Sequence, residues 1–160
     1  MKITKITIHG FRQYKDLKVE FNSADKDEHD LHIIIAKNGI GKTNLLNAIE
    51  WCLYDDEPHL GNPEEALKRI NNTLFDEAIA LGEKEVTLSV ELLIDHGNEK
   101  VKIKREQTFS TKTAFGFTSV LMVTVMKKDN SDIIKDGEAM EYVNGLFKKE
   151  IREYFFFDGE

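Results

Sequence analysis

The residues best suited to chemistry are a lysine and a threonine that close a glycine-containing loop. Residues 36–43 read AKNGIGKT, which matches the phosphate-binding loop pattern G-x-x-x-x-G-K-[ST] except at its first position. In that pattern, backbone N–H groups surround a phosphate, the lysine brings a positive charge to the β- and γ-phosphates, and the hydroxyl contacts Mg²⁺. The loop therefore predicts binding of a nucleoside triphosphate, with ATP and Mg²⁺ as cofactors.

Ala36 stands where the pattern usually has glycine, and alanine fits there if its φ angle is negative. Gly39 is expected to permit the sharp turn, and Gly41 is expected to let the backbone approach the phosphate. Asn44 either bonds the nucleotide or caps the following helix. A glycine turn with an incidental lysine is the alternative interpretation of the whole loop. The predicted nucleotide-binding residues are Lys37, Asn38, Gly39, Ile40, Gly41, Lys42, Thr43 and Asn44, of which Thr43 is also a predicted Mg²⁺ ligand.

The segments on either side of the loop have the character that such a loop requires. The continuous apolar run from Leu31 to Ala36 predicts a strand buried on both faces, as in a parallel sheet. From Lys42 the apolar period becomes helical, and it predicts an amphipathic helix that ends near Tyr54. Within this helix Cys52 is expected to be a small buried hydrophobe. Trp51 and Tyr54 are expected to pack between the helix and a sheet.

The rest of the chain predicts a mixture of strands and helices. Alternating apolar residues indicate an antiparallel sheet with one solvated face over residues 84–128, and residues 95–98 have the composition of a hairpin turn. The fold class is therefore α/β, with a mixed sheet around the phosphate loop and an antiparallel β subdomain. The predicted strands are residues 3–10, 14–21, 85–95, 98–106 and 117–129, and the further predicted helices are residues 64–81 and 138–152.

Composition narrows the class of protein. The net charge is −7, from 22 basic and 29 acidic residues, which argues against DNA binding over the general surface. A single cysteine cannot form an internal disulfide, which suits a reducing cytoplasm. The sequence has neither a secretory leader nor an apolar run of roughly 18 residues, so we expect a cytoplasmic or nucleoid-associated protein with no membrane partner.

Two stretches of this sequence resemble the N-terminal lobe of the SMC-type ABC ATPases, the chromosome-maintenance and break-repair class. They are the aromatic-Arg-x-aromatic element at residues 11–14, FRQY, and the loop and helix at residues 38–49, NGIGKTNLLNAI. The hairpin at residues 86–106 and the ending YFFFDGE most resemble DndD, the ATPase of DNA phosphorothioate modification, and its relatives in phage defence. The resemblance covers essentially the whole chain.

The resemblance implies roles for residues outside the loop. Arg12 would reach the nucleotide phosphates, whereas a solvated arginine at a strand end is the alternative. The ending FFFDGE would be the Q-loop, and Asp158 stands where the family has a glutamine that contacts Mg²⁺. Aspartate is a suitable oxygen ligand for Mg²⁺, so Asp158 is a second candidate metal ligand.

The resemblance also implies that half of the active site lies elsewhere. In this family a coiled coil follows the N-terminal lobe, a C-terminal lobe supplies the catalytic residues, and ATP joins two heads as a homodimer. We therefore expect residues 1–160 to be a fragment that binds ATP with little or no hydrolysis. In the full-length protein the expected partners are the chain's own C-terminal lobe, a second head, DNA, and DNA-modification or repair proteins.

Two other interpretations of the chain are left open. YFFFD also has the form of a Walker B strand, so the chain could be a self-contained small NTPase with Asp158 and Glu160 as catalytic residues. Asp95 offers a weaker version of that strand. The chain could instead be a docking module that binds ATP without hydrolysing it.

A basic strip lies on the second strand of the predicted hairpin, and three of its members share one face. SMC-type heads meet DNA partly through this region, so phosphate contacts are one interpretation. A solvated strand face balanced by neighbouring acids is the other. The strip consists of Lys100, Lys102, Lys104 and Arg105, and the first three are the predicted DNA contacts.

Overall fold

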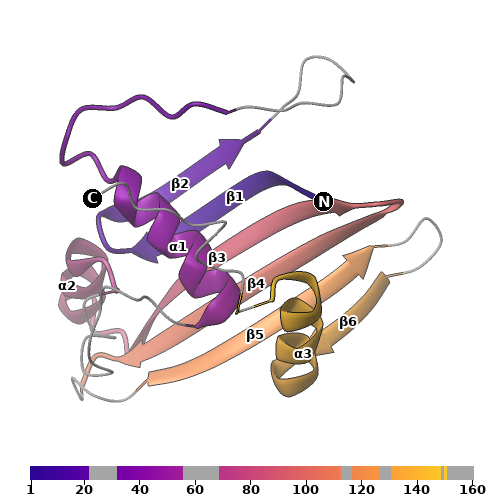
Figure 1. Cartoon of the computed structure of the whole chain (residues 1–160). Helices are drawn as coiled ribbons and strands as arrows, with labels where there is room; N and C mark the ends of the chain where they lie inside the picture. The colour runs from indigo at the N-terminus through magenta and orange to yellow at the C-terminus, as the bar shows by residue number, and fades with distance from the viewer. Residues whose placement is uncertain (22–31, 56–68, 113–116, 127–130, 149, 151–160) are drawn as a thin grey trace.

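The computed structural model of this chain describes residues 1–21, 32–55, 69–112, 117–126, 131–148 and 150. These residues form six strands and three helices (Figure 1). The strands are β1 (Lys2–Phe11), β2 (Tyr14–Glu20), β3 (Glu85–His96), β4 (Glu99–Ser110), β5 (Phe117–Met126) and β6 (Ser131–Lys135), and the helices are α1 (Lys42–Tyr54), α2 (Asn72–Ala80) and α3 (Asp136–Leu146).

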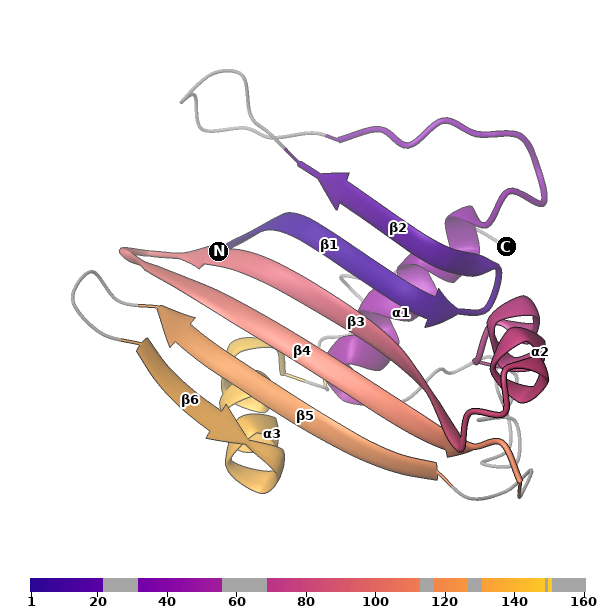
Figure 2. The ribbon, with the colours of Figure 1, turned by 180° about the vertical axis from the view of Figure 1, so that it is seen from behind.

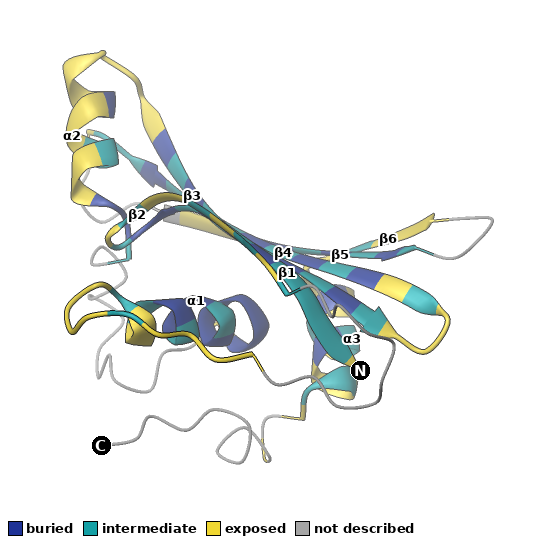
Figure 3. Cartoon of the chain, turned by 90° about the horizontal axis from the view of Figure 1, so that it is seen from above, coloured by how far each residue is buried: buried dark blue, intermediate teal, exposed yellow. Residues whose placement is uncertain are grey.

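The strands form one six-stranded sheet in the order β2-β1-β3-β4-β5-β6. Every pairing in it is antiparallel. Figure 3 shows α1 and α3 against the same face of this sheet, with α2 at one end. Figure 2, viewed from behind, shows the strands in front of α1 and α3, so these two helices cover the same face of the sheet. None of the described helices is long and apolar enough to cross a membrane.

The core lies between the sheet and α1. Strands β3 and β4 alternate buried and half-buried residues along their length, because successive side chains of a strand point to opposite faces. Each fully buried aliphatic side chain contributes about 1.5–3 kcal/mol to stability, and the sheet supplies many of them. The fully buried members of this core include Ala48, Trp51, Cys52 and Leu53 of α1 and Leu88, Val90, Leu92, Ile94, Val101 and Ile103 of the sheet.

Most of the predicted elements are confirmed. Helix α1 spans the predicted residues, and β1, β2, β3, β4 and β5 all overlap the predicted strands. The hairpin turn between β3 and β4 is also confirmed, because His96 pairs with Glu99 and Gly97 has a φ of 61°. Trp51 and Cys52 are fully buried, as predicted, and the Trp51 ring packs against that of Phe11 at 5.7 Å between centroids.

The buried parallel strand predicted for Leu31 to Ala36 is wrong over the residues that the structure describes. Residues 32–37 have no regular secondary structure, and Ile33 and Ile35 are 72% and 90% exposed. Continuous apolarity predicts burial only if a partner strand is available on each side, and no strand of the described sheet pairs with this segment. The predicted mixed sheet is also wrong, since the described sheet is wholly antiparallel.

The helix boundaries differ from the predicted ones. Residues 69–71 precede α2, and Ile70 forms an isolated β-bridge with Phe11 instead of a helical turn. Helix α3 begins at Asp136 and ends at Leu146, so the helix predicted to reach residue 152 ends earlier. Strand β6 has no predicted counterpart, because its five residues are too few to show a period. Residues 64–68 and 151–160 lie outside the described part of the chain.

Candidate functional site

The loop before α1 has the backbone that its sequence predicts. Gly39 and Gly41 both lie in the left-handed region, with φ of 82° and 105°, where residues with a Cβ are disfavoured. Ala36 is not among the described residues with positive φ, so alanine is tolerated there as predicted. Helix α1 begins directly after Gly41, whose carbonyl accepts the N–H of Leu45 at 2.9 Å.

The N-terminal end of α1 is chemically open. It has no side-chain cap, and its first turn contains no acidic residue. The first N–H groups of a helix have no partner within the helix and carry a partial positive charge. Lys42 and Thr43 are exposed at this end, so a lysine, a hydroxyl and unpartnered backbone donors share one site. This donor set suits a phosphate together with an oxygen-liganded cation.

The Lys42 side chain folds back over its own loop. Its Nζ donates to the carbonyl oxygens of Ala36, at 2.8 Å, and Lys37, at 3.3 Å. Both acceptors are neutral and exposed to water, so they hold the ammonium group less strongly than a phosphate would. The lysine is therefore positioned above the loop, and its present contacts are exchangeable.

The turn between β1 and β2 lies against this loop. Arg12 donates from Nη1 to Oδ1 of Asn44 at 2.7 Å, and Asn44 donates from Nδ2 to Oε1 of Gln13 at 2.7 Å. Gln13 in turn donates from Nε2 to the carbonyl of Ile40. Asn44 thus bonds the turn instead of capping its own helix. The structure thus brings Arg12 to Asn44, directly after the loop, and its contact with nucleotide phosphates stays a prediction.

Gly41 is favoured by its φ angle, and a side chain there would also have to displace two side chains of the turn. A Cβ placed on Gly41 would lie 1.8 Å from Nε2 of Gln13 and 2.8 Å from the hydroxyl of Tyr14, whereas one on Gly39 would meet nothing within 4 Å. The Tyr14 hydroxyl donates to the Gly41 carbonyl at 2.8 Å. Burial raises the pKa of Tyr14, so this donor keeps its proton. Neither Gln13 nor Tyr14 had a predicted role, although both belong to the FRQY element.

The backbone of Arg12 is strained. Its φ is 48°, and a left-handed conformation costs a residue other than glycine about 1–2 kcal/mol. Arg12 and Gln13 are the two turn residues between the paired Phe11 and Tyr14. Glycine would fit the first turn position without strain. An arginine there indicates that its side chain has a use at the loop.

The C-terminal end of α1 is closed by a buried arginine. Arg105 of β4 is 2% exposed, and its Nε donates to the carbonyl of Cys52 at 3.0 Å. Its Nη1 lies 3.3 Å from Oδ2 of Asp55, and Asp55 ends the helix with a φ of 57° and its N–H bonded to Trp51. Burial lowers the pKa of Arg105, and Asp55 partly offsets this. A cation at a helix C-terminus is favourable.

Cys52 lies next to this arginine and is chemically protected. Its Sγ donates to the carbonyl of Val90 at 3.3 Å. Burial raises the pKa of the Cys52 thiol to about 12, so it stays protonated and unreactive at neutral pH. It acts as a packing residue, as predicted.

The predicted basic strip is divided between the two faces of β4. Lys100, Lys102 and Lys104 lie on the face away from α1, whereas Arg105 is buried beneath α1. Each lysine has a carboxylate neighbour, at 3.9 Å in Asp95, 3.8 Å in Glu91 and 2.8 Å in Glu106, respectively. The surface is thus balanced in charge locally.

Of the remaining predicted site residues, the structure describes those of the loop but not those of the C-terminal ending. Lys37, Asn38 and Ile40 lie exposed on the loop, next to the open end of α1. Asp158 and Glu160 lie outside the described residues.

A protein-family comparison identifies the domain. The model of the AAA_23 family, described as an AAA domain, matches residues 5–160, nearly the whole chain. This chain belongs to that AAA domain family. The assignment agrees with the phosphate-loop geometry described above.

Curated relatives of this AAA domain include DNA replication and repair proteins and chromosome proteins. It is 27% identical to the DNA replication and repair protein RecF of Acetivibrio thermocellus over 137 residues, which are 86% of this chain and 35% of the relative. It is 27% identical to RecF of Lactobacillus acidophilus over 98% of this chain and 40% of the relative. It is 31% identical to Structural maintenance of chromosomes protein 3 of Caenorhabditis elegans over 66% of this chain and 8% of the relative.

These similarities support the predicted resemblance to the N-terminal region of SMC-like ATPases. The narrower resemblance to DndD stays a prediction. The chain spans roughly a third of the length of its RecF relatives and a much smaller share of the chromosome protein.

Proposed function

We propose that this chain is the ATP-binding lobe of an SMC-like ATPase that acts on DNA. The observation that carries the proposal is the open N-terminal end of α1, where Gly41 starts the helix without a side-chain cap or an acid. Three cationic side chains, Arg12, Lys37 and Lys42, belong to the loop or to the turn against it. A triphosphate is the anion that this combination of donors and charge suits best.

In this proposal the loop residues divide the work of binding. The N–H groups of residues 37–43 surround the phosphates, and Lys42 leaves its two neutral carbonyl acceptors for a phosphate oxygen. Thr43 holds Mg²⁺, which when bound offsets phosphate charge and fixes the geometry of the phosphate chain. Arg12, already directed at the loop through Asn44, adds a second cation that offers two parallel donors.

Hydrolysis is proposed to require a further lobe. Ile33, Ile34 and Ile35 are 72%, 49% and 90% exposed, and three consecutive isoleucines in extended chain suit burial in a sheet. We propose that a C-terminal lobe of the full-length protein covers this run and brings the catalytic residues, and that two heads form a homodimer on ATP binding. RecF relatives about three times as long as the matched region are consistent with such a lobe.

The proposed DNA contact uses the lysines of β4. Lys102 and Lys104 alternate with the buried residues of β4 and so lie on the sheet face away from α1. Their ion pairs are partly exposed and so of low energy, and a phosphate backbone would compete with them. Charge reversal at both positions in the complete protein tests the contact. Unchanged DNA affinity, and an unchanged dependence on salt, would remove it.

Within the broader class of proteins that act in DNA repair, we propose a more specific, DndD-like role in DNA phosphorothioate modification or phage defence. Its support is the likeness of the hairpin now seen as β3–β4 and of the YFFFDGE ending. Deletion of the gene from a strain that carries phosphorothioate DNA tests this role. We expect the deletion to abolish the modification. The wild-type gene should restore it, and its Lys42→Ala form should not. Unchanged modification would contradict this role.

The direct test of the ATPase proposal is Mg·ATP hydrolysis by this chain alone, with Lys42→Ala as the blank. We expect ATP binding without turnover above the blank. Clear turnover would favour the self-contained NTPase in which Asp158 and Glu160 are catalytic. Absence of turnover in the full-length protein as well would favour a docking module that binds ATP without hydrolysing it.

A further inference from the structure

The strained backbone conformation of Arg12 is stabilised by hydrogen bonds from a neighbouring segment of the chain. The left-handed φ of 48° is unfavourable for arginine, yet the side chain must leave the turn in the direction of Asn44 to make its 2.7 Å bond. A small change in the turn would move a long side chain by several ångströms at its tip. The contacts to the Arg12 backbone therefore control where the guanidinium group lies.

Those contacts come from the segment before α2. The Arg12 N–H donates to the carbonyl of Arg69 at 2.5 Å, and the Arg12 carbonyl accepts from Nδ2 of Asn71, also at 2.5 Å. The Asn71 N–H donates to the carbonyl of Gly10 at 2.8 Å, and Phe11 and Ile70 form a β-bridge. The backbone groups on both sides of the strained bond are thus held by one three-residue segment.

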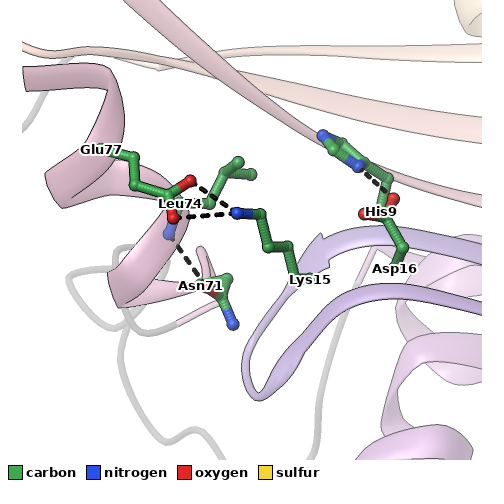
Figure 4. Close-up of polar contacts among 6 residues, drawn as sticks. All are labelled: His9, Lys15, Asp16, Asn71, Leu74 and Glu77. Carbon is green, nitrogen blue, oxygen red and sulfur yellow. Dashed lines mark hydrogen bonds and ion pairs between the residues drawn. The ribbon is translucent and has the colours of Figure 1, made fainter. Parts of the chain in front are cut away.

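Asn71 performs two functions with one amide group. Its Oδ1 accepts the N–H of Leu74 at 3.0 Å and so caps α2, as Figure 4 shows. Its Nδ2 holds the Arg12 carbonyl. The side chain is 6% exposed, so water competes little for either bond. Capping of α2 requires only the Oδ1 atom of Asn71. It does not explain the hydrogen bond that Nδ2 donates to the Arg12 carbonyl.

We propose that Asn71 is a positioning residue of the phosphate site. Through the Arg12 carbonyl it holds the strained turn in the conformation that directs the guanidinium group to the P-loop, and it thereby connects α2 to nucleotide affinity. This inference rests on the proposed ATP-binding function. Asn71 lies 27 residues beyond Asn44 in the sequence, and it belongs to neither of the motifs that define the loop.

A second connection between α2 and the turn serves as an internal control. Lys15 donates from Nζ to both carboxylate oxygens of Glu77, at 2.9 and 2.6 Å, and Figure 4 shows this pair beside Asn71. Both side chains are about half exposed, so the pair is screened by water. It joins the same two elements without touching the Arg12 backbone. If only the general docking of α2 mattered, loss of either connection would have the same effect.

The substitution that separates the two functions of Asn71 is Asn71→Asp. Aspartate keeps the oxygen that caps α2 and is an equally good N-cap. It replaces the donor to the Arg12 carbonyl by an acceptor, so that bond is lost and two oxygens face each other. Asn71→Ser, which keeps a capping hydroxyl on a shorter side chain, is the second variant in case the carboxylate disturbs folding. Glu77→Gln is the matched control on α2.

The experiment measures the Kd for Mg·ATP in residues 1–160 by equilibrium titration, in a double-mutant cycle with Arg12→Gly. We expect Asn71→Asp to weaken binding about tenfold, which corresponds to the loss of one buried hydrogen bond. In the Arg12→Gly background the same substitution is expected to change Kd less than twofold, because no strained arginine remains to be held. Glu77→Gln is expected to change Kd less than twofold.

A readout without nucleotide separates this inference from the proposed function. The guanidinium NMR signal of Arg12, assigned by its loss in Arg12→Gly, is expected to shift in the ligand-free Asn71→Asp chain and to stay in place in Glu77→Gln. An unchanged Arg12 signal, or an equal loss of affinity with and without Arg12, overturns the positioning role. A flat ATP titration of the unaltered chain with a shifted Arg12 signal overturns the proposed function and leaves the Asn71–Arg12 connection supported.

Discussion

The two ends of helix α1 differ in whether other parts of the protein satisfy their backbone groups. At the C-terminal end, a carbonyl of the last turn receives a buried donor from Arg105, and Asp55 completes the closure. At the N-terminal end no side chain caps the helix, no acid lies in the first turn, and Lys42 is exposed. Helix ends of both kinds carry unsatisfied backbone groups. The protein satisfies one set from within and leaves the other to water or a ligand.

The difference separates stability from binding along a single helix. The buried end fixes α1 to the sheet, and the rigid helix then presents its open end at a defined place. Substitutions at the C-terminal end are therefore expected to change the free energy of unfolding. At the N-terminal end, loss of an exposed side chain is expected to change nucleotide affinity, and only substitutions that strain the loop backbone are expected to change stability as well.

The largest effect is expected from Arg105→Ala. The substitution removes the donor to the Cys52 carbonyl and leaves a cavity under α1, and truncation of a large buried side chain costs about 2–5 kcal/mol. Urea denaturation measures it. Lys104→Ala, on the next residue of the same strand but on the opposite face, is the control, and we expect a cost below about 1 kcal/mol. If both variants lost a similar free energy of unfolding, Arg105 would not fix the C-terminal end of α1 to the sheet.

The next effect concerns Lys42→Ala at the open end. We expect Mg·ATP affinity to fall by about 100-fold, equivalent to about 2.7 kcal/mol, with the free energy of unfolding unchanged because the lysine touches only exposed carbonyls. Thermal stabilisation by added Mg·ATP measures both quantities in one series. Lys37→Ala, which removes a neighbouring charge from the same loop, is expected to cost less than tenfold. Equal losses would mean that the loop attracts ATP by charge alone.

A smaller effect distinguishes the two loop glycines. Gly41→Ala must displace Gln13 and Tyr14 as well as adopt an unfavourable φ, so we expect it to cost about 2 kcal/mol of stability. Gly39→Ala meets no neighbour and carries only the backbone cost, about 1 kcal/mol. Urea midpoints of the two variants give the comparison. If Gly39→Ala proved the more costly, the turn would not lie against Gly41 as described.

The smallest effect is a pH dependence from the closed end. The folded pKa of Cys52, about 12, is above its ordinary value of 9.0, so the folded state keeps this proton when the unfolded chain has lost it. Stability is then fully present below pH 9 and falls as the pH rises from about 9 to 12, by roughly 1 kcal/mol at pH 10. The control is denaturation of the Cys52→Ala variant below pH 9 and at pH 10. An equal alkaline loss in that variant would assign the effect to other groups.

The sequence predicted the elements whose burial is decided locally. Helix α1 and strands β3 and β4 have clear apolar periods, so their limits could be read from the chain. The phosphate loop was predictable because its glycines, lysine and threonine occur at fixed spacing. Arg12 was predictable only through the family resemblance, since nothing within its own strand indicates a contact 32 residues away.

The parts that were missed depend on contacts between distant segments. The Leu31–Ala36 run has the composition of a buried strand, but its burial depends on partners that no described strand provides. Gln13 and Asn71 act through side-chain hydrogen bonds, including one from each to a backbone carbonyl, and such bonds leave no trace in hydrophobic periodicity. Arg105 appears in the sequence as one more member of a basic strip. Alternation along the strand separates Arg105 from the three lysines, but only the structure shows that α1 covers the face on which Arg105 lies.

The most direct test of this account is backbone-amide NMR of the ¹⁵N-labelled 160-residue chain during titration with Mg·ATP. We predict that the amide signals of Gly39 to Thr43 shift in a saturable way and that those of Cys52 to Asp55 stay in place. Saturable shifts confined to other segments, or none at the loop at millimolar nucleotide, would contradict the claim that the open end of α1 binds the phosphates.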